Sequence, residues 1–350
     1  MKEIKVHLST QEKAYNIEFP KDFNSLDERL LKQISGRNFL LVTDENVFEK
    51  SPFFNSKVRS FQSPTLLKNI LVLPPGEIYK TWETVEKILN KAFELNLDRT
   101  AVFIVIGGGI YGDLVGFAAS IFMRGVPFVQ VPTSLLAMVD SSVGGKTGYN
   151  CTQGKNLIGA FHQPETVLCC SKFLETLPLE EVKNGIAEMV KHGILTDSSH
   201  FENLEKLSKT HLKDGDCTEL FKLVPDSITI KKQIVEQDEK ESGIRGHLNL
   251  GHTFGHAVEH LSNFEIPHGR AIAIGTVMAT QYAAERKLCD WDLVDRIENI
   301  FNQFDIDLVC DFSEKEIFKA MEHDKKKKDG KIRLILPKKI GKVEYFEMEN

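Results

Sequence analysis

The first half of the chain alternates short apolar runs with one clearly amphipathic stretch. Residues 81–95 place Trp82, Val85, Ile88, Leu89, Ala92 and Phe93 on one face of a helix. Runs rich in β-branched or aromatic residues and bounded by turn residues predict strands at Phe39–Thr43, Ile70–Leu73, Ala101–Ile106, Phe128–Val131 and Thr166–Cys169. A strand, a helix and a further strand in this order predict a parallel sheet with crossover helices.

After about residue 175 the apolar spacing becomes helical. Helices are expected to include Val182–Leu195, Phe201–Leu207, Ala271–Ala284 and Leu293–Phe301. Near the C-terminus, alternating residues on both sides of Pro337 and Gly341 predict a terminal hairpin. The pattern therefore predicts an α/β N-terminal domain, residues 1–170, followed by a mainly α-helical domain, residues 171–350.

Composition narrows the class of protein. The 350 residues carry 44 Lys and Arg against 50 Asp and Glu, a net charge of −6, so nucleic acid is not expected to be a partner. Six cysteines without a Cys-x-x-Cys pair indicate reduced thiols rather than a disulfide framework. The N-terminal residues resemble no signal peptide and no apolar run approaches a membrane span, so we expect a cytoplasmic protein without a membrane partner.

A glycine-rich turn directly follows the predicted strand Ala101–Ile106. Gly107, Gly109 and Gly112 fit G-x-G-x-x-G before an apolar helix start, which allows a pyrophosphate to approach the backbone and the helix N-terminus. A tight strand-to-helix turn fits the same residues. Asp44, at the end of another predicted strand, is a candidate ligand for a ribose, although acidic residues also form turns there.

Residues 131–159 are unusually rich in Gly, Ser, Thr, Lys and Asn for a segment between apolar strands. Backbone amides, hydroxyls, Lys146 and Lys155 together favour a loop that binds an anionic ligand. A solvated loop is the alternative.

Histidines gather between Asn249 and Gly269. A spacing of four places His252, His256 and His260 on one helical face, where neutral imidazoles can bind a divalent metal, and His268 follows. An exposed polar face has the same spacing. Glu188 and Lys191 are three residues apart, so they form either a buried pair or a surface pair. Arg124, Lys231, Arg245 and the run Lys325–Lys328 each fit solvated surface when taken singly.

These segments together resemble the 3-dehydroquinate synthase family over nearly the whole chain. The matching segments are PPGEIYK, GGGIYGDLVGF, FMRG, VPTSLLAMVDSSVGGKTGYN, GKNLIGAFHQP, NGIAEMVKHG, GIRGHLNLGHTFGHAVE, PHG and DKKKKDGKIRLILP. The resemblance implies a Rossmann-like NAD domain, a helical metal-binding domain, an active site between them, and a homodimer.

The resemblance also implies roles for individual residues. It places a zinc or cobalt ion on Glu188, His252 and His268. It assigns the substrate phosphate to Lys146, Asn156, Asn249, His256, Lys325 and Arg124, the last from the neighbouring subunit. It assigns the substrate carboxylate and hydroxyls to Asp140, Lys191, Lys231 and Arg245. The NAD positions are Asp44, Glu77, Lys80, Gly108, Gly109, Ile110, Asp113, Thr133, Ser134, Lys146, Lys155, Thr176 and Leu177.

The implied activity converts 3-deoxy-D-arabino-heptulosonate 7-phosphate, a sugar phosphate of the shikimate pathway, to 3-dehydroquinate and phosphate. Oxidation at C5 acidifies the C6 proton, phosphate is eliminated, the ketone is reduced again, and an aldol step closes the ring, so NAD is recycled. Alternatives are a 2-deoxy-scyllo-inosose or valiolone synthase, a metal-dependent alcohol dehydrogenase, and a non-catalytic NAD-binding protein. Arg245 favours a substrate with a carboxylate.

The chain departs from the family pattern at three positions. Tyr111 replaces a small aliphatic residue, Met138 replaces a common glutamine, and Arg270 replaces the glutamate that usually follows His-Gly. Because Arg270 lies beside His268, its charge is expected to be the departure that most affects metal affinity. None of the three removes a residue assigned above, so we expect the activity to survive.

Overall fold

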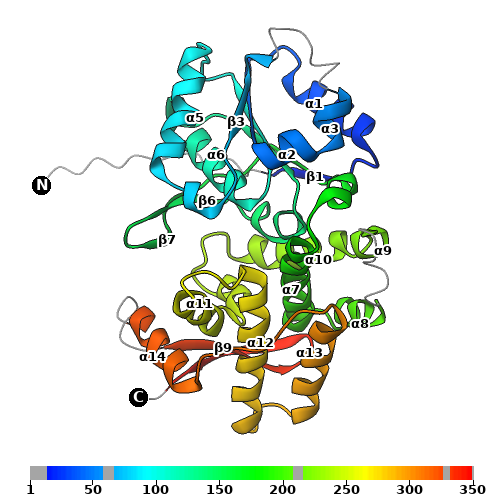
Figure 1. The fold of residues 1–350 in the computed structure, drawn as a ribbon, viewed down its shortest axis with the longest axis vertical. Coiled ribbons are helices and arrows are strands. Elements are labelled where there is room, and N and C mark those ends of the chain that lie inside the picture. The colour runs from blue at the N-terminus through cyan, green and yellow to red at the C-terminus, as the bar shows by residue number, and fades with distance from the viewer. Residues whose placement is uncertain (1–13, 58–66, 208–215, 326–331, 349–350) are drawn as a thin grey trace, which may run out of the picture.

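The computed structural model describes residues 14–57, 67–207, 216–325 and 332–348. An α/β domain and a mainly helical domain are stacked along the long axis of the molecule (Figure 1), as the sequence predicts. The predicted boundary near residue 170 falls between β8 and α7 and stays a prediction. No helix within the described ranges has the length and apolar character needed to cross a lipid bilayer.

A parallel sheet forms the centre of the N-terminal domain. Its six strands lie in the order β1-β8-β5-β4-β2-β3, and every neighbouring pair is parallel. Their bounds are β1 Asn16–Glu18, β2 Phe39–Asp44, β3 Ile70–Leu73, β4 Val102–Gly107, β5 Phe128–Pro132 and β8 Thr166–Leu168. The five predicted strands are confirmed, and β1 is an additional edge strand.

Helices cover both faces of this sheet, which explains why its central strands are apolar throughout. Phe103 and Val105 of β4 pack against α5 (Trp82–Glu94) and α6 (Gly109–Ile121). Val102 and Ile104, which point the opposite way, share a core with α1 (Phe23–Ile34) and α3 (Pro52–Lys57). Shorter elements connect these strands and helices: α2 Glu45–Lys50, η1 Glu77–Tyr79, η2 Phe122–Arg124 and η3 Ala137–Ser141, with η4 Ser171–Thr176 following β8.

The glycine-rich segment after β5 is not the loop that the sequence predicts. It forms η3 and then an antiparallel hairpin, β6 (Lys146–Cys151) with β7 (Gly154–Phe161). Gly148 and Gly159 face one another across this hairpin. A Cβ on Gly148 would lie 2.4 Å from the carbonyl oxygen of Ile158, and one on Gly159 would lie 2.1 Å from that of Thr147. The glycines therefore allow close strand approach here, rather than a flexible loop.

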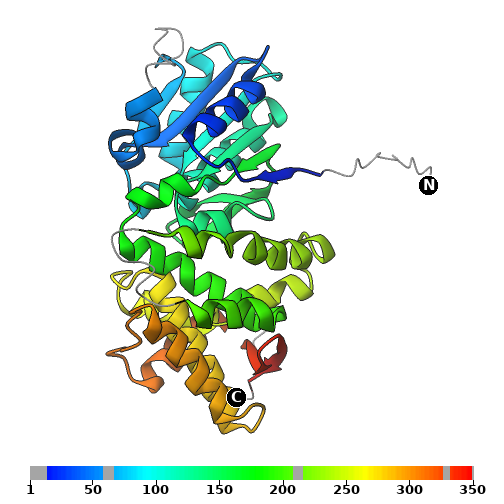
Figure 2. The same cartoon turned by 90° about the vertical axis from the view of Figure 1, so that its right-hand side faces the viewer.

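The C-terminal domain consists of packed helices with a hairpin at its end. Its helices are α7 Leu179–Thr196, α8 Ser198–Lys206, α9 Thr218–Phe221, α10 Val224–Gln237, η6 Ile244–Asn249, α11 His252–Leu261, α12 His268–Glu285, α13 Trp291–Gln303 and α14 Glu314–Lys325. The four predicted helical stretches are confirmed. The predicted terminal hairpin is also confirmed, as β9 (Arg333–Lys339) and β10 (Lys342–Glu347), which lie against α12 and α7 (Figure 2).

Candidate active site

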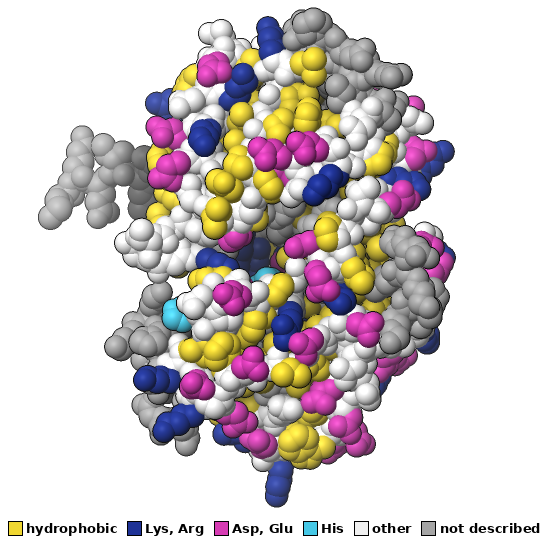
Figure 3. Space-filling model, in the orientation of Figure 1, with side chains coloured by type: hydrophobic (Ala, Val, Ile, Leu, Met, Phe, Trp, Pro, Cys, Tyr) yellow, Lys and Arg dark blue, Asp and Glu magenta, His cyan; other side chains and the backbone are white. Residues whose placement is uncertain are grey.

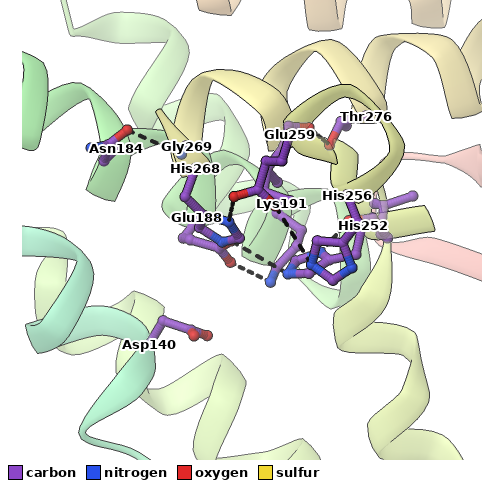
Figure 4. Close-up of polar contacts among 12 residues, drawn as sticks. Asp140, Asn184, Glu188, Lys191, His252, His256, Glu259, His268, Gly269 and Thr276 are labelled. Carbon is purple, nitrogen blue, oxygen red and sulfur yellow. Dashed lines mark hydrogen bonds and ion pairs between the residues drawn. The ribbon is translucent and has the colours of Figure 1, made fainter. Parts of the chain in front are cut away.

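Three side chains from three helices converge on one point in the helical domain (Figure 4). Oε1 of Glu188, on α7, lies 3.9 Å from Nε2 of His252, the first residue of α11. It also lies 3.8 Å from Nε2 of His268, the first residue of α12. Glu188 is 1% exposed, and no described residue donates a hydrogen bond to Oε1. A buried carboxylate oxygen aimed at two imidazole nitrogens fits a divalent metal such as zinc.

Hydrogen bonds on the far side of each imidazole leave Nε2 free for a metal. Nδ1 of His252 lies 3.1 Å from the carbonyl oxygen of Leu250, which can only accept, so Nδ1 carries the proton. Nδ1 of His268 lies 3.3 Å from Oε1 of Glu259 and donates to that carboxylate. These acceptors hold an Nδ1 proton on the far side of each ring, so that both Nε2 atoms face the same point.

The charge states of His252 and Glu188 also suit a metal, whereas His268 holds an additional proton. Burial lowers the pKa of His252 to about 3, so this imidazole is neutral at pH 7. Burial raises the pKa of Glu188, but the paired ammonium of Lys191 outweighs it and holds that pKa below its ordinary value. Burial lowers the pKa of His268, yet the carboxylates of Glu188 and Glu259 raise it overall to about 9. A metal must therefore displace a proton from His268.

A second polar cluster lies beside the first and joins the two domains. Nζ of Lys231, on α10, lies 2.6 Å from both the carbonyl oxygen and Oδ1 of Asp140, on η3. Burial raises the pKa of Asp140, but the Lys231 ammonium holds it well below its ordinary value. His192 of α7 is fully buried, with Nδ1 2.7 Å from Oγ of Ser227 and Nε2 3.8 Å from Oδ1 of Asp140.

Taken singly, the sequence patterns suggest that Arg245 and Lys231 are solvated surface residues. The structure shows that both are buried. Arg245 is 1% exposed and Lys231 is 5% exposed. Nη2 of Arg245 donates to the carbonyl oxygen of Gly144 at 3.0 Å, and Nη1 donates to that of Glu239. Gly144 has φ +100°, and a Cβ there would lie 2.4 Å from Nη2. Backbone carbonyls and carboxylates make the burial of these cations possible, which no single-residue pattern reveals.

The glycine turn lies where strand order reverses, which is where ligands bind in open α/β sheets. β3 lies beyond β2, whereas β5 lies on the other side of β4, so the reversal falls between β2 and β4. Asp44 ends β2, and its Oδ1 accepts from the backbone N–H of Val47 at 3.1 Å. Gly108 is the N-cap of α6, and a Cβ on Gly107 would lie 3.7 Å from Oδ2 of Asp44.

Some of the other predicted NAD positions contact one another, and the rest lie at the ends of neighbouring elements. Nζ of Lys80 lies 2.6 Å from Oδ2 of Asp113, and the backbone N–H of Asn150 donates to the carbonyl oxygen of Lys80 at 2.8 Å. Asn150 also donates to Oε1 of Glu77 at 2.8 Å. Gly109 and Ile110 begin α6, Thr133 and Ser134 follow β5, and Thr176 and Leu177 end η4 and follow it.

Several predicted residues from the two domains lie against one another. Lys146 pairs with Glu241, whose Oε1 accepts from Nδ2 of Asn249 at 2.9 Å. Nζ of Lys155 lies 3.6 Å from Oε1 of Glu259. Between the two domains the surface is hollowed, with Lys or Arg and His side chains visible inside the hollow (Figure 3).

Other predicted residues lie at the edge of these contacts, and Asn156 joins them only through its backbone N–H, which donates to Oδ1 of Asn150 at 3.0 Å. Arg124 is exposed on η2, and Asn156 is exposed with φ +55°. The side chain of His256 is 51% exposed, and its Nε2 lies 4.0 Å from Oε2 of Glu259. Lys325 is the last residue of α14, and its side chain lies outside the described residues, as do Lys326–Lys328.

The histidine spacing is only partly informative. His260 is exposed and belongs to none of the described candidate metal groups, whereas His268 comes from a different helix. Sequence reasoning also missed Glu241, Glu259 and His192. The one local signal was that Glu259 follows His256 by three residues, which is one helical turn.

The three departures from the family pattern are accommodated away from the metal candidates. Arg270 donates from Nε to the carbonyl oxygen of Asp307 at 2.9 Å, donates from Nη2 to that of Val309 at 2.8 Å, and pairs with the carboxylate of Asp307. Tyr111 is buried and donates its hydroxyl hydrogen to the carbonyl oxygen of Pro74, and Met138 is buried in the core. The charge of Arg270 is therefore neutralised by Asp307.

Comparisons with known proteins agree along the whole chain. The family model described as 3-dehydroquinate synthase N-terminal matches residues 70–184, and the family model described as 3-dehydroquinate synthase C-terminal matches residues 185–327. The 3-dehydroquinate synthase of Shewanella loihica is 40% identical over 351 residues, covering 99% of this chain and 96% of the relative. That of Prochlorococcus marinus is 38% identical over 356 residues, covering 99% and 97%.

Solved structures share the fold. A 2-epi-5-epi-valiolone synthase from Streptomyces hygroscopicus, solved with NAD⁺ and Zn²⁺, superposes with a TM-score of 0.85 at 23% identity, covering 99% of this chain and 96% of that one. A 2-deoxy-scyllo-inosose synthase, solved with carbaglucose-6-phosphate, NAD⁺ and Co²⁺, has a TM-score of 0.79 at 25% identity, covering 94% and 91%.

Proposed function

The chain belongs to the 3-dehydroquinate synthase family, and from this premise we propose that it converts 3-deoxy-D-arabino-heptulosonate 7-phosphate to 3-dehydroquinate and phosphate. The observation that carries the proposal is the convergence of Glu188, His252 and His268 beside buried cations between the two domains. When bound, NAD takes up and returns a hydride, and a divalent metal polarises the substrate oxygens that it contacts.

The metal would be held by Oε1 of Glu188 and by Nε2 of His252 and His268, which lie 3.9 Å and 3.8 Å from that oxygen. Three protein ligands leave coordination positions open for substrate oxygens. We propose zinc as the metal, with cobalt as a substitute, because a carboxylate with two imidazoles suits both ions. NAD would be held at the strand reversal, with Asp44 as the residue that would bind its ribose and the first turn of α6 as the element that would bind its pyrophosphate.

The remaining groups bind and orient the substrate. The substrate carries the negative charges of a carboxylate and a phosphate. These charges are balanced by the ammonium groups of Lys191 and Lys231 and by the guanidinium of Arg245. Asp140 accepts from Lys231 and offers its other carboxylate oxygen to a substrate hydroxyl. Because these groups are held by hydrogen bonds before substrate arrives, they chiefly supply position.

Arg245 favours this substrate over those of the sister cyclases. Its guanidinium is buried, and its Nε has no hydrogen-bond partner among the described residues. A buried donor without an acceptor is costly, and a substrate carboxylate would satisfy it. A sugar phosphate without a carboxylate would leave that donor unpaired.

The test follows phosphate release from 3-deoxy-D-arabino-heptulosonate 7-phosphate with catalytic NAD and zinc, while absorbance at 340 nm is recorded. Many turnovers without NADH accumulation are expected. Two neighbouring lysines give a matched pair: Lys231→Met should lower the rate at least about 100-fold, whereas Lys232→Met should not, because Lys232 is exposed and pairs with Glu236. NADH accumulating without phosphate release would instead indicate a dehydrogenase.

We further propose a homodimer in which Arg124 completes the neighbouring active site. Arg124 is exposed on η2 beside Met123, an apolar side chain that is 46% exposed. Mixing inactive Arg124→Ala and His268→Ala chains should restore about a quarter of the activity, because half of the dimers then contain one intact site. Mixtures that remain inactive after subunit exchange would contradict the shared site.

We also propose a cytoplasmic location. It is supported by six cysteines that are all free thiols, which a reducing compartment maintains. Thiol titration of protein denatured directly from cells should find all six reduced.

A further inference from the structure

Glu259 is a buried carboxylate to which neither the sequence pattern nor the proposed reaction gives a role. It lies on α11 and is 5% exposed. Its Oε1 is 3.3 Å from Nδ1 of His268 and 3.6 Å from Nζ of Lys155, and its Oε2 is 4.0 Å from Nε2 of His256. A buried carboxylate needs partners that compensate its charge, and the ammonium and the two imidazoles are the groups placed to do so.

We propose that Glu259 is the positioning residue of the metal centre, acting through His268. Its carboxylate accepts the Nδ1 proton of His268 and thereby fixes the tautomer and ring orientation that aim Nε2 at Glu188. This inference rests on the proposed function, because it assumes that Glu188, His252 and His268 bind a metal.

The two histidines differ in what orients them. His252 donates to a neutral acceptor, the carbonyl oxygen of Leu250, which belongs to the backbone two residues before it. His268 is half-buried at the start of α12, and its Nδ1 contacts a charged acceptor on another helix. A carboxylate behind a metal-binding imidazole raises its basicity and holds the ring, and removing such a partner typically lowers metal affinity about 10- to 100-fold.

Lys155 offers a competing explanation for the burial of Glu259. It reaches from β7 of the N-terminal domain, and its Nζ also lies 4.1 Å from the centre of the Phe264 ring. If Glu259 served only to anchor Lys155, then removing Lys155 would have the same effect on the metal as removing Glu259. Since His268 is closer to the shared oxygen, we expect the two substitutions to differ.

The experiment measures zinc affinity of metal-free full-length protein by competition with a chromophoric chelator. The variants are Glu259→Gln, Lys155→Met and Glu265→Gln, the last an exposed glutamate shortly after α11 that serves as the matched control. Cobalt(II) spectra of the same proteins report the geometry at the metal, and circular dichroism verifies that each variant is folded.

Glu259→Gln is expected to weaken zinc binding about tenfold or more and to alter the cobalt spectrum, while Glu265→Gln and Lys155→Met stay within about threefold of the unaltered chain. Unchanged zinc affinity in folded Glu259→Gln, or an equal loss in Lys155→Met, would overturn this inference alone. Failure of the unaltered chain to bind zinc stoichiometrically would overturn the proposed metal centre and this inference with it.

Discussion

Oδ1 of Asn184 accepts a hydrogen bond of 3.0 Å from the backbone N–H of Gly269, and this bond joins the two helices that carry Glu188 and His268. Asn184 lies one turn before Glu188 on α7, and Gly269 follows His268 at the start of α12. A Cβ on Gly269 would lie 2.3 Å from Cα of Asn184. The close approach of the two backbones therefore sets the separation of the two candidate ligands.

Substituting Gly269 by alanine should disturb this approach. The added methyl would lie 2.3 Å from Cα and 2.7 Å from the carbonyl oxygen of Asn184, which are backbone atoms of α7, so α12 must shift. We expect Gly269→Ala to lower the free energy of unfolding by about 1–3 kcal/mol and to weaken zinc binding. Urea unfolding and chelator competition measure the two effects. Lower stability with unchanged zinc affinity would show that the helix separation does not control the metal geometry.

Glu188 and Lys191 form a buried ion pair, so removing one partner should destabilise the metal-free protein. Both residues are 1% exposed. Glu188→Gln leaves the Lys191 ammonium uncompensated, which should cost about 3–5 kcal/mol in the free energy of unfolding. Adding Lys191→Met should recover most of that loss, whereas zinc binding should stay absent in both variants. Chemical denaturation with and without chelator separates the effects, and zinc binding by the double variant would exclude Glu188 as a ligand.

The sequence predicts the strands well because β4 and its neighbours are covered on both faces and carry uninterrupted apolar runs. It fails at β6 and β7, where Gly148 and Gly159 suggest a loop although close strand pairing is what requires them. Local composition cannot distinguish these two uses of glycine.

The spacing of the histidines along the sequence predicts only part of the candidate metal site. Periodicity groups His252 and His256 with His260, but the contacts of the folded chain join His252 to Glu188 and His268. Those contacts arise from the packing of α7, α11 and α12 against one another. The spacing of residues within one helix carries no information about that packing. The burial of Arg245 has the same origin, since its partners are backbone carbonyls distant in sequence or across a turn.

Reversing the charge of Arg270 should leave catalysis nearly unchanged. Although Arg270 is two residues after His268, its guanidinium contacts Asp307 and the carbonyl oxygen of Val309 instead of the imidazole. Arg270→Glu should lower the free energy of unfolding by about 1 kcal/mol through repulsion from Asp307, and kcat/KM for phosphate release should stay within about threefold. A tenfold loss of zinc affinity would instead show that this charge reaches the metal centre.

The carboxylate of Asp238 organises the turn that carries Arg245. It accepts hydrogen bonds from the backbone N–H groups of Ser242 at 2.8 Å, Gly243 at 2.7 Å and Arg245 at 3.1 Å. Asp238→Asn retains only one acceptor oxygen, so the turn should loosen and Arg245 should lose its fixed position. We expect KM for the substrate to rise about tenfold with a smaller change in kcat, because Arg245 binds rather than reacts.

The same carboxylate should make the turn sensitive to acid. The backbone hydrogen bond from Ser242 is the largest of the interactions that lower the pKa of Asp238 from its ordinary value of 3.8 to about 2 in the folded chain. Because the folded pKa is the lower one, this stabilisation is fully present above pH 3.8 and is lost as the pH falls through 2. Acid unfolding of Asp238→Asn should therefore depend less on pH in this window than that of the unaltered chain. Glu236→Gln, which changes an exposed carboxylate on the adjoining helix, is the matched control, and identical acid profiles for all three proteins would contradict the role of Asp238.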